Sequence, residues 1–370
     1  MAITSDIQTI RRPRIGIDCH VLTGKAQGSA TFLLNMLREM ARLDCPFETV
    51  LYCHDKHAAQ QLIGPSPFVY IELRPMGSLR RLLLSYPRQL RRDKIDLAIF
   101  QFVTPPLSTV PALVIVHDLL PFSHPHLFPP FFRWSRQRLF SLSIARARAI
   151  ATVSEFSRGE IVRLFPDKSE RVCVIVNGPT FSVENAEMAS PVVGAYILAV
   201  GRIEKRKKID LLVKAFIAAN LEDVSLVIVG SADMGYKLSL PEDSRIVYLQ
   251  NVPTPVLASI YKRARLFVFP SEAEGFGIPV LDALLAGVPV IASNQTAIPE
   301  VAMGLARLFD PTRPDVEWQL ASLLRGHFSD DPVPAPSIAQ REQLAQTYSW
   351  HESARKLVSL IARLTQRVSA

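Results

Sequence analysis

The stretch LFVFPSEAEGFGIPVLDALLAGVPVIAS, residues 266–293, already indicates the fold class. It begins with Leu266–Phe269, an apolar run that predicts a buried strand. A glycine-bearing loop follows, and Pro279 suits the first turn of a helix, where its missing N–H would have no partner. The apolar run Val288–Ala292 predicts a second strand. A strand, a helix and a strand in this order form a βαβ unit, so we expect parallel sheets of the α/β class.

The same alternation covers most of the 370 residues in two series. Runs rich in Val, Ile and other apolar residues predict strands at 14–18, 49–53, 95–100, 113–117, 149–153 and 172–176, and then at 196–201, 225–230, 245–249, 266–269 and 288–292. Helical patterns lie between them, such as Thr31–Arg42 with an apolar stripe and Phe131–Arg148.

A polar, proline-bearing stretch from Gly178 to Pro191 separates the two series. We therefore expect two doubly wound, Rossmann-like domains that face a cleft, at residues 1–185 and 186–350. The helix expected at 351–367 should pack back onto the first domain. Ligands of open α/β sheets bind where the carboxyl ends of the strands meet, so functional residues are expected there.

The composition excludes several classes of protein. Apolar residues make up 48% of the chain and charged residues 21%, which argues against a disordered or fibrous protein. Four cysteines, at 19, 45, 53 and 173, form no CxxC pair, so neither a disulfide framework nor structural zinc is expected, and the compartment should be reducing. Asp282, two prolines and two glycines argue against a membrane span at 276–293, and no apolar segment near the N-terminus predicts a secretory signal.

Most of the net charge of +8 belongs to the first half of the chain, since residues 1–190 hold 23 Lys and Arg against 16 Asp and Glu. Seven basic residues lie from Arg74 to Lys94 among five leucines. This pattern is typical of a basic amphipathic helix, here broken by Pro87, that binds an anionic surface. The alternative is a solvated helix whose leucines pack on its own domain. Because a series of interleaved aromatics is missing, nucleic acid is not an expected partner.

The loop before Pro279 has the makeup of a phosphate site. The amides from Gly275 to Ile278 are predicted to form a helix N-terminus, and the glycines let a diphosphate approach the backbone. Glu274 lies just before this terminus and Asp282 about one turn inside it, so their carboxylates are placed to accept hydrogen bonds from sugar and ribose hydroxyls. The alternative is structural, with a Glu near the N-cap and an Asp that compensates the helix dipole.

Positive charge for such a site follows the first strand of the second series. The segment GRIEKRKK, residues 201–208, holds five cations at that strand's carboxyl end, although an isolated run of this kind is often only a basic turn. On the first domain, His117 ends a predicted strand and is a candidate partner for a sugar hydroxyl, or else a buried core histidine. Gly24 and Gly28 lie in the loop after the first strand. No GxxxxGK[ST] or GxGxxG motif occurs, which disfavours P-loop kinases and plain dinucleotide dehydrogenases.

Together these segments resemble a known family. SEAEGFGIPVLDALLAGVPVIAS followed by NQTAIPEVA is similar to the donor-site signature of the GT4 family of retaining glycosyltransferases with the GT-B fold. VHDLLPFSHPHLFPPFFRW, ATVSEFSRGEI, VGRIEKRKKIDLLVKAF and YSWHESARKLVSLIARL resemble the same family in the same order. The resemblance therefore spans nearly the whole chain, and within the family it points to bacterial mannosyltransferases of envelope polysaccharide synthesis.

The resemblance implies roles for individual residues. Glu274 matches the first glutamate of the EX7E motif, near the donor sugar, and Asp282 stands where the second glutamate binds the ribose, one methylene shorter. His117 matches the histidine that faces the donor sugar, and with Glu274 it forms the expected catalytic set. The residues expected to bind the diphosphate are Arg202, Lys207, Gly28, Gly275, Phe276 and Gly277, with Arg206 or Lys208 as substitutes for either cation.

The resemblance also implies a function. The donor is expected to be a nucleotide-sugar, GDP-mannose by analogy, and the acceptor a lipid-linked oligosaccharide, with no metal or other cofactor. The first domain is then the acceptor side and the second the donor side. The enzyme is expected to be cytoplasmic and peripheral on the inner face of the cell membrane. The alternatives are a UDP-sugar-dependent transferase of the same fold and a non-catalytic sugar-nucleotide-binding partner, the latter suggested by Asp282.

Overall fold

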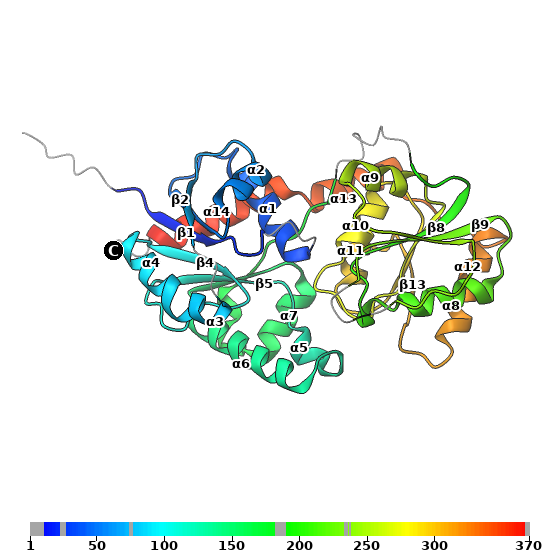
Figure 1. The fold of residues 1–370 in the computed structure, drawn as a ribbon, viewed down its shortest axis with the longest axis horizontal. Coiled ribbons are helices and arrows are strands. Elements are labelled where there is room, and N and C mark those ends of the chain that lie inside the picture. Colours follow the sequence, from blue (N-terminus) through cyan, green and yellow to red (C-terminus); the bar gives the residue numbers. More distant parts are fainter. Residues whose placement is uncertain are drawn as a thin grey trace, which may run out of the picture. The chain divides into compact units, whose positions relative to one another are not determined.

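The computed structural model describes residues 11–22, 27–73, 77–181, 190–232, 236 and 238–366. Its strands form a seven-stranded sheet of order β3-β2-β1-β4-β5-β6-β7 and a six-stranded sheet of order β10-β9-β8-β11-β12-β13 (Figure 1). The strands are β1 (Arg14–Asp18), β2 (Glu48–Cys53), β3 (Val69–Glu72), β4 (Leu97–Gln101), β5 (Ala112–Val116), β6 (Ala149–Thr152), β7 (Val172–Val174), β8 (Ala195–Val200), β9 (Val224–Val229), β10 (Ile246–Leu249), β11 (Leu266–Phe269), β12 (Val290–Ser293) and β13 (Arg307–Phe309).

Helices connect these strands. They are α1 (Gly28–Met40), α2 (Lys56–Ile63), α3 (Ser78–Arg80), η1 (Arg81–Ser85), α4 (Tyr86–Arg92), α5 (Leu120–Ser123), η2 (Pro125–Leu127), α6 (Pro130–Arg146), α7 (Glu155–Leu164), η3 (Pro166–Arg171), η5 (Lys205–Lys207), α8 (Ile209–Ala219), α9 (Thr254–Arg263), α10 (Ile278–Leu285), α11 (Ile298–Ala302), α12 (Val316–Phe328), α13 (Ile338–Thr347) and α14 (Trp350–Gln366).

Both sheets have the doubly wound strand order. In each, the first strand lies between the second and the fourth, so the direction of winding reverses beside it. The pairs β1 with β2 and β4, and β8 with β9 and β11, are all parallel. The predicted α/β class with two Rossmann-like folds is thereby confirmed.

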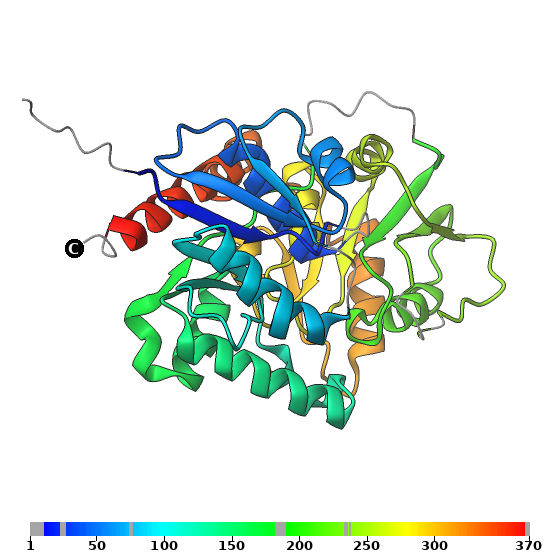
Figure 2. The ribbon, with the colours of Figure 1, turned by 60° about the vertical axis from the view of Figure 1, so that its left-hand side comes forward.

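The chain divides into two compact units. Unit 1 comprises Met1–Ile115, Leu139–Ala151 and Ala354–Ala370, and unit 2 comprises Val116–Arg138 and Thr152–Ser353. Figure 2 shows α14, in red, near the first strands and helices of unit 1, in blue. The predicted domain boundary between residues 185 and 186 lies outside the described residues and stays a prediction.

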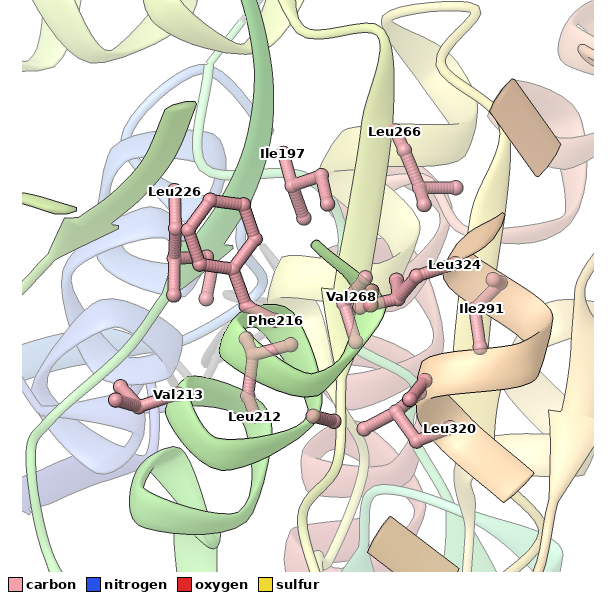
Figure 3. Close-up of a cluster of buried hydrophobic side chains, with 14 of the residues drawn as sticks. Ile197, Leu212, Val213, Phe216, Leu226, Leu266, Val268, Ile291, Leu320 and Leu324 are labelled. Atoms are coloured by element: carbon pink, nitrogen blue, oxygen red, sulfur yellow. The ribbon is translucent and has the colours of Figure 1, made fainter. Parts of the chain in front are cut away.

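The core of unit 2 explains why its sheet forms. Helix α8 buries an apolar stripe that includes Leu212, Val213 and Phe216, and α12 adds Leu320 and Leu324. Figure 3 shows these side chains gathered with those of the strands. The strand residues of this cluster are Ile197, Ala199, Val224, Leu226, Ile228, Leu266, Val268, Ile291 and Phe309. Burial of so much apolar area is the main force that holds the sheet and fixes its carboxyl edge.

Unit 1 is built in the same way. The buried residues of α1 are the predicted stripe, Phe32, Leu33, Met36, Leu37 and Met40, which confirms that prediction. Within the described part of the chain, no helix is long and apolar enough to cross a membrane.

The basic segment differs from its prediction at Pro87, which does not break the helix. A π turn, η1, joins α3 to α4, and the N–H of Tyr86 donates to the carbonyl of Arg81 five residues back. The wider turn accommodates a proline that has no N–H to donate. Leu90 is buried, whereas Leu79 and Leu84 are exposed, so this helix has both a packed and an open face. Arg74 lies outside the described residues.

Candidate functional site

The candidate site lies at the switch point of the unit 2 sheet. Strands β8 and β11 are parallel neighbours, paired through Leu266 with Ile197 and Phe267 with Leu198. Their carboxyl ends therefore lie at the same edge, where open α/β sheets bind ligands. The loop after β8 holds the basic run 201–208, and the loop after β11 holds 270–277. The predicted site residues other than Gly28 all belong to unit 2.

The glycine loop ends as predicted in a helix N-terminus. Helix α10 begins at Ile278, with Pro279 in its first turn and Gly277 as the N-cap residue at φ 108°. That backbone conformation favours glycine over residues with a Cβ. Phe276 is buried and its ring packs edge-on against Tyr348 at 5.4 Å between centroids. Phe276 can therefore bind a phosphate only through its backbone N–H.

Within unit 2, Gly275 lies against the backbone of His117. A Cβ on Gly275 would lie 2.2 Å from the carbonyl oxygen of His117, so only glycine fits there without movement. The hydroxyl of Ser154 donates to the Gly275 carbonyl at 2.8 Å. His117 is buried, and burial lowers the pKa of its imidazole to about 4, so the ring is neutral near pH 7. The structure thus places the backbone of His117 beside the glycine loop, and the role of its side chain toward a donor sugar stays a prediction.

Gly275→Ala is expected to destabilise the protein by about 1–3 kcal/mol, because the new methyl group would overlap the His117 carbonyl. Gly159→Ala is the matched control, since a Cβ added there would have no neighbour within 4 Å and the residue lies inside α7. There the change should be neutral or stabilising by up to about 1 kcal/mol. Urea denaturation of both variants measures this, and equal stabilities would contradict the close approach.

Glu274 is the centre of a buried ion cluster. Its Oε1 lies 2.5 Å from Lys207 Nζ and accepts a hydrogen bond from the Ser271 hydroxyl, and its Oε2 lies 2.9 Å from Arg206 Nη1. Burial alone would raise the pKa of this carboxyl, but the Arg206 and Lys207 charges outweigh it and lower the pKa to about 2. The N–H of Glu274 donates to the Thr296 hydroxyl at 2.9 Å, which fixes the backbone. Glu274 is therefore an ionised, oriented carboxylate.

The basic loop divides its cations among different partners. Lys207 is buried, with its Nζ 4.9 Å from the Phe269 ring centroid. Arg206 lies between Glu274 and Glu204, 2.7 Å from a Glu204 oxygen, and also donates to the carbonyl of Ala273 at 2.6 Å. Arg206 is thus a central member of the cluster, although the sequence analysis gave it only as a substitute.

The two cations predicted for the diphosphate do meet at one pocket. Arg202 and Lys207 both line a small pocket with Gly201, Phe269 and Pro270. Arg202 Nε is 3.7 Å from Glu204, and 41% of its side chain is exposed. Lys208 turns instead to Glu272, 2.9 Å away, whose other oxygen contacts His126. The role of Arg202 and Lys207 in binding a phosphate stays a prediction. Lys208 is a weaker substitute than Arg206, because it pairs with Glu272.

Asp282 is buried in α10 and faces a distant loop. Its Oδ1 accepts a hydrogen bond from the N–H of Thr180 at 2.8 Å. Burial raises the pKa of this carboxyl to about 7, against the smaller opposing effect of Thr180. Asp282 therefore holds the backbone at Thr180, and its role in ribose binding stays a prediction.

Asp282→Asn is expected to change how stability depends on pH. A folded-state pKa raised to about 7 means that the folded protein binds more protons than the unfolded chain between about pH 4 and 7, so stability contributed below pH 4 is lost as the pH rises through 7. The loss is at most about 4 kcal/mol. Asparagine does not titrate, so unfolding free energies of the variant should fall less between pH 5 and 8. Parallel profiles for both proteins would contradict the raised pKa.

Other residues were missed by the sequence analysis. Ser271 bonds the Glu274 carboxylate, and Asp118, next to His117, has a pKa raised by burial despite the nearby Arg206 charge. Neither stands out in sequence, because a serine and an aspartate in loops are common. Gly28 is the first residue of α1, in unit 1, and its part in phosphate binding stays a prediction.

Two family models and several named proteins are similar to this chain. Residues 26–179 match the family model described as Glycosyltransferase Family 4, and residues 194–322 match the one described as Glycosyl transferases group 1. The chain is 29% identical over 266 residues to O-antigen chain mannosyltransferase B of Escherichia coli, covering 67% of this chain and 69% of that protein. It is 28% identical to the O-antigen chain mannosyltransferase RfbU of Salmonella typhimurium, covering 58% of this chain and 61% of that protein.

Solved structures support the fold. Sucrose-phosphate synthase from Thermosynechococcus elongatus superposes with a TM-score of 0.73 over 96% of this chain and 100% of that one, at 16% identity. A lipopolysaccharide glycosyltransferase, WaaG, superposes with a TM-score of 0.69 over 94% of this chain and 99% of that one, at 15% identity.

Proposed function

Because the chain belongs to glycosyltransferase family 4 and has the GT-B fold, we propose that this glycosyltransferase moves mannose from GDP-mannose onto a lipid-linked oligosaccharide in cell-surface polysaccharide synthesis. The observation that carries the proposal is the buried cluster of Glu274, Lys207 and Arg206 beside the glycine loop. The choice of mannose rests on the names of the relatives, which are O-antigen mannosyltransferases.

The cluster suits the departure of a nucleoside diphosphate. Negative charge develops on the leaving group, and Arg202 and Lys207 lie together at the edge of the sheet where we place its phosphates. The N-terminus of α10 adds its partial positive charge from the other loop. Before the donor binds, Glu274 neutralises Lys207 and Arg206, so that these buried cations are compensated in both states.

The protonation states assign the remaining roles. A carboxylate with a pKa of about 2 is a poor general base near pH 7, so Glu274 is assigned to orienting the donor sugar and its cations. His117 is a neutral imidazole and is proposed as a hydrogen-bond partner of a donor-sugar hydroxyl. The acceptor proton then goes to a phosphate oxygen of the donor, which fits front-face attack with retention of the anomeric configuration. No metal is required in this scheme, because cations of the chain face the diphosphate.

A lipid-linked acceptor is held in a membrane, so the enzyme is expected to bind a membrane surface. The helical segment 78–92 exposes Leu79 and Leu84 together with basic side chains, a combination that favours the anionic inner face of a cell membrane. The exposed basic residues of this segment are Arg80, Arg88, Arg91 and Arg92.

Changing these four arginines to Gln is expected to weaken binding to vesicles of anionic lipid, by about 1 kcal/mol for each charge that lies near the surface. Added salt should reduce the difference between the two proteins, because exposed charges are screened. Co-sedimentation with vesicles measures this difference. Equal binding by both proteins at low salt would indicate that the segment is a solvated helix face that does not bind lipid.

Two alternatives differ from the proposal in measurable ways. A UDP-sugar-dependent transferase of this fold should bind UDP more tightly than GDP in calorimetry. A non-catalytic partner should bind a nucleotide-sugar but release no nucleotide from it, even over long incubation. The proposal predicts tighter binding of GDP than UDP and slow hydrolysis of GDP-mannose without acceptor, and the opposite order of affinities would overturn the choice of donor.

A further inference from the structure

The first turns of α6 expose two aromatic rings that lie close together, those of Phe131 and Trp134, and a third, Phe132, on another part of the helix surface. Phe131 is 79% exposed, Trp134 55% and Phe132 40%. The ring centroids of Phe131 and Trp134 are 6.4 Å apart, so the two rings form one patch. Single exposed apolar side chains are common on proteins, but a contiguous aromatic patch marks an interaction surface. These residues take no part in the site described above.

The same stretch is free of negative charge. From Leu119 to Ser154 the chain has five arginines and no Asp or Glu. One of these arginines lies on the patch, because the guanidinium carbon of Arg138 is 5.9 Å from the Trp134 ring centroid. That of Arg136 is 5.0 Å from the Phe132 centroid, beside the patch. The partner of this surface is therefore both apolar and anionic.

The patch is held in place by the helix that carries it. Pro130 begins α6, and the ring of Phe128, just before it, stacks on Phe132 at 5.7 Å between centroids. Further along the helix, Gln137 Nε2 donates to the carbonyl of Pro121 at 2.8 Å, which ties the helix to the segment before it. These contacts hold the N-terminal turns of α6, and therefore the exposed rings, in place.

We infer that the aromatic patch, Phe131 and Trp134 with Arg138, inserts into the headgroup region of an anionic lipid surface. Trp and other aromatic rings favour that region, where the ring is in apolar surroundings and polar groups stay wet. Arginines beside the rings reach lipid phosphates. Nucleic acid fits less well, because the Arg138 guanidinium occupies the Trp134 ring face on which a base would stack. This contact is independent of the helical segment 78–92 and of the donor chosen above.

Tryptophan fluorescence offers a test with an internal control. Trp134 and Trp318 are both exposed, at 55% and 68%, but Trp318 lies on α12 and has no part in the patch. The full-length Trp318→Phe variant reports on Trp134, and Trp134→Phe reports on Trp318, with Trp350 common to both. Vesicles of phosphatidylcholine with phosphatidylglycerol carrying brominated chains should quench and blue-shift the emission of Trp318→Phe alone. Quenching of neither variant, or of both equally, would overturn the inference.

A binding measurement gives the size of the effect. Phe131→Ser with Trp134→Ser should weaken vesicle binding by at least about tenfold, as expected for two rings kept out of the interface. Trp318→Ser should leave it unchanged, and circular dichroism shows whether each variant is folded. Unchanged vesicle binding by the folded double variant would overturn the inference. It would also be overturned if the double variant lost self-association or oligonucleotide binding but still bound vesicles. None of these results bears on nucleotide binding or transfer, which are measured separately.

Discussion

Glu274→Gln is expected to lower the rate of sugar transfer about a thousandfold while GDP binding is kept or improved. The carboxylate contacts Lys207 and Arg206 at 2.5 and 2.9 Å, and its loss removes the group that holds these cations and the donor sugar in register. Loss of one preorganised electrostatic contact of this kind costs about 10²–10³ in kcat. With no carboxylate to compete, however, both cations are open to the diphosphate.

The same change should affect stability. From sequence alone, removal of Glu274 is expected to leave the melting temperature nearly unchanged, since a cleft carboxylate binds ligand and not the core. The structure alters that expectation, because Lys207 would be left as a buried cation without its carboxylate, while Arg206 would keep Glu204 alone as its acidic partner. Breaking such a pair costs about 3–5 kcal/mol in the free energy of unfolding. GDP should restore part of that loss.

The measurements are kcat per folded molecule, GDP affinity by calorimetry, and Tm with and without GDP. Glu272→Gln is the matched control in the same loop, because Glu272 contacts Lys208 and His126 and not the cations of the pocket. It should retain most of the activity. A Glu274→Gln enzyme that transfers at the normal rate, or that loses GDP binding in proportion to activity, would contradict the assigned role.

Arg202→Ala with Lys207→Ala is expected to weaken GDP binding by about 2–4 kcal/mol, or roughly thirty- to a thousandfold in Kd. Both side chains line the pocket next to Pro270, and each can donate a charge-assisted hydrogen bond to a phosphate. Lys205→Ala is the control, since Lys205 lies in the same loop but is exposed. Unchanged GDP affinity in the folded double variant would place the diphosphate elsewhere.

The strands that lie inside the sheets are the part of the fold that sequence predicts best. The bounds of β1 and β11 were predicted to the residue. Strand β11 consists of apolar residues alone, because it is buried on both faces, and β1 has buried isoleucines between two charged residues. The edge strands β3 and β13 were not predicted. They are only four and three residues long, and most of their residues are exposed or half-buried, so neither forms a sustained apolar run.

The location of the candidate site could be predicted from sequence, but the contacts between its side chains could not. Loops that follow neighbouring parallel strands must meet, which brings residues 201–208 and 270–277 together. Which cation of the run reaches Glu274 depends on the single 3₁₀ turn η5 and on Lys208 in the left-handed region at φ 51°. The hydrogen bond from Thr180 to Asp282 joins residues that are 102 positions apart in the sequence, so a local sequence pattern could not predict it.

The central claim is tested most directly by following radiolabelled sugar from donor to acceptor. The purified full chain would be incubated with a polyprenyl-linked oligosaccharide extract and either GDP-mannose or UDP-glucose, each labelled in the sugar, with Glu274→Gln in parallel. Label should enter the lipid-linked fraction from GDP-mannose with the unaltered protein alone, accompanied by an equal amount of GDP. Label from UDP-glucose only, or no transfer from any donor by a protein that binds GDP, would contradict the central claim.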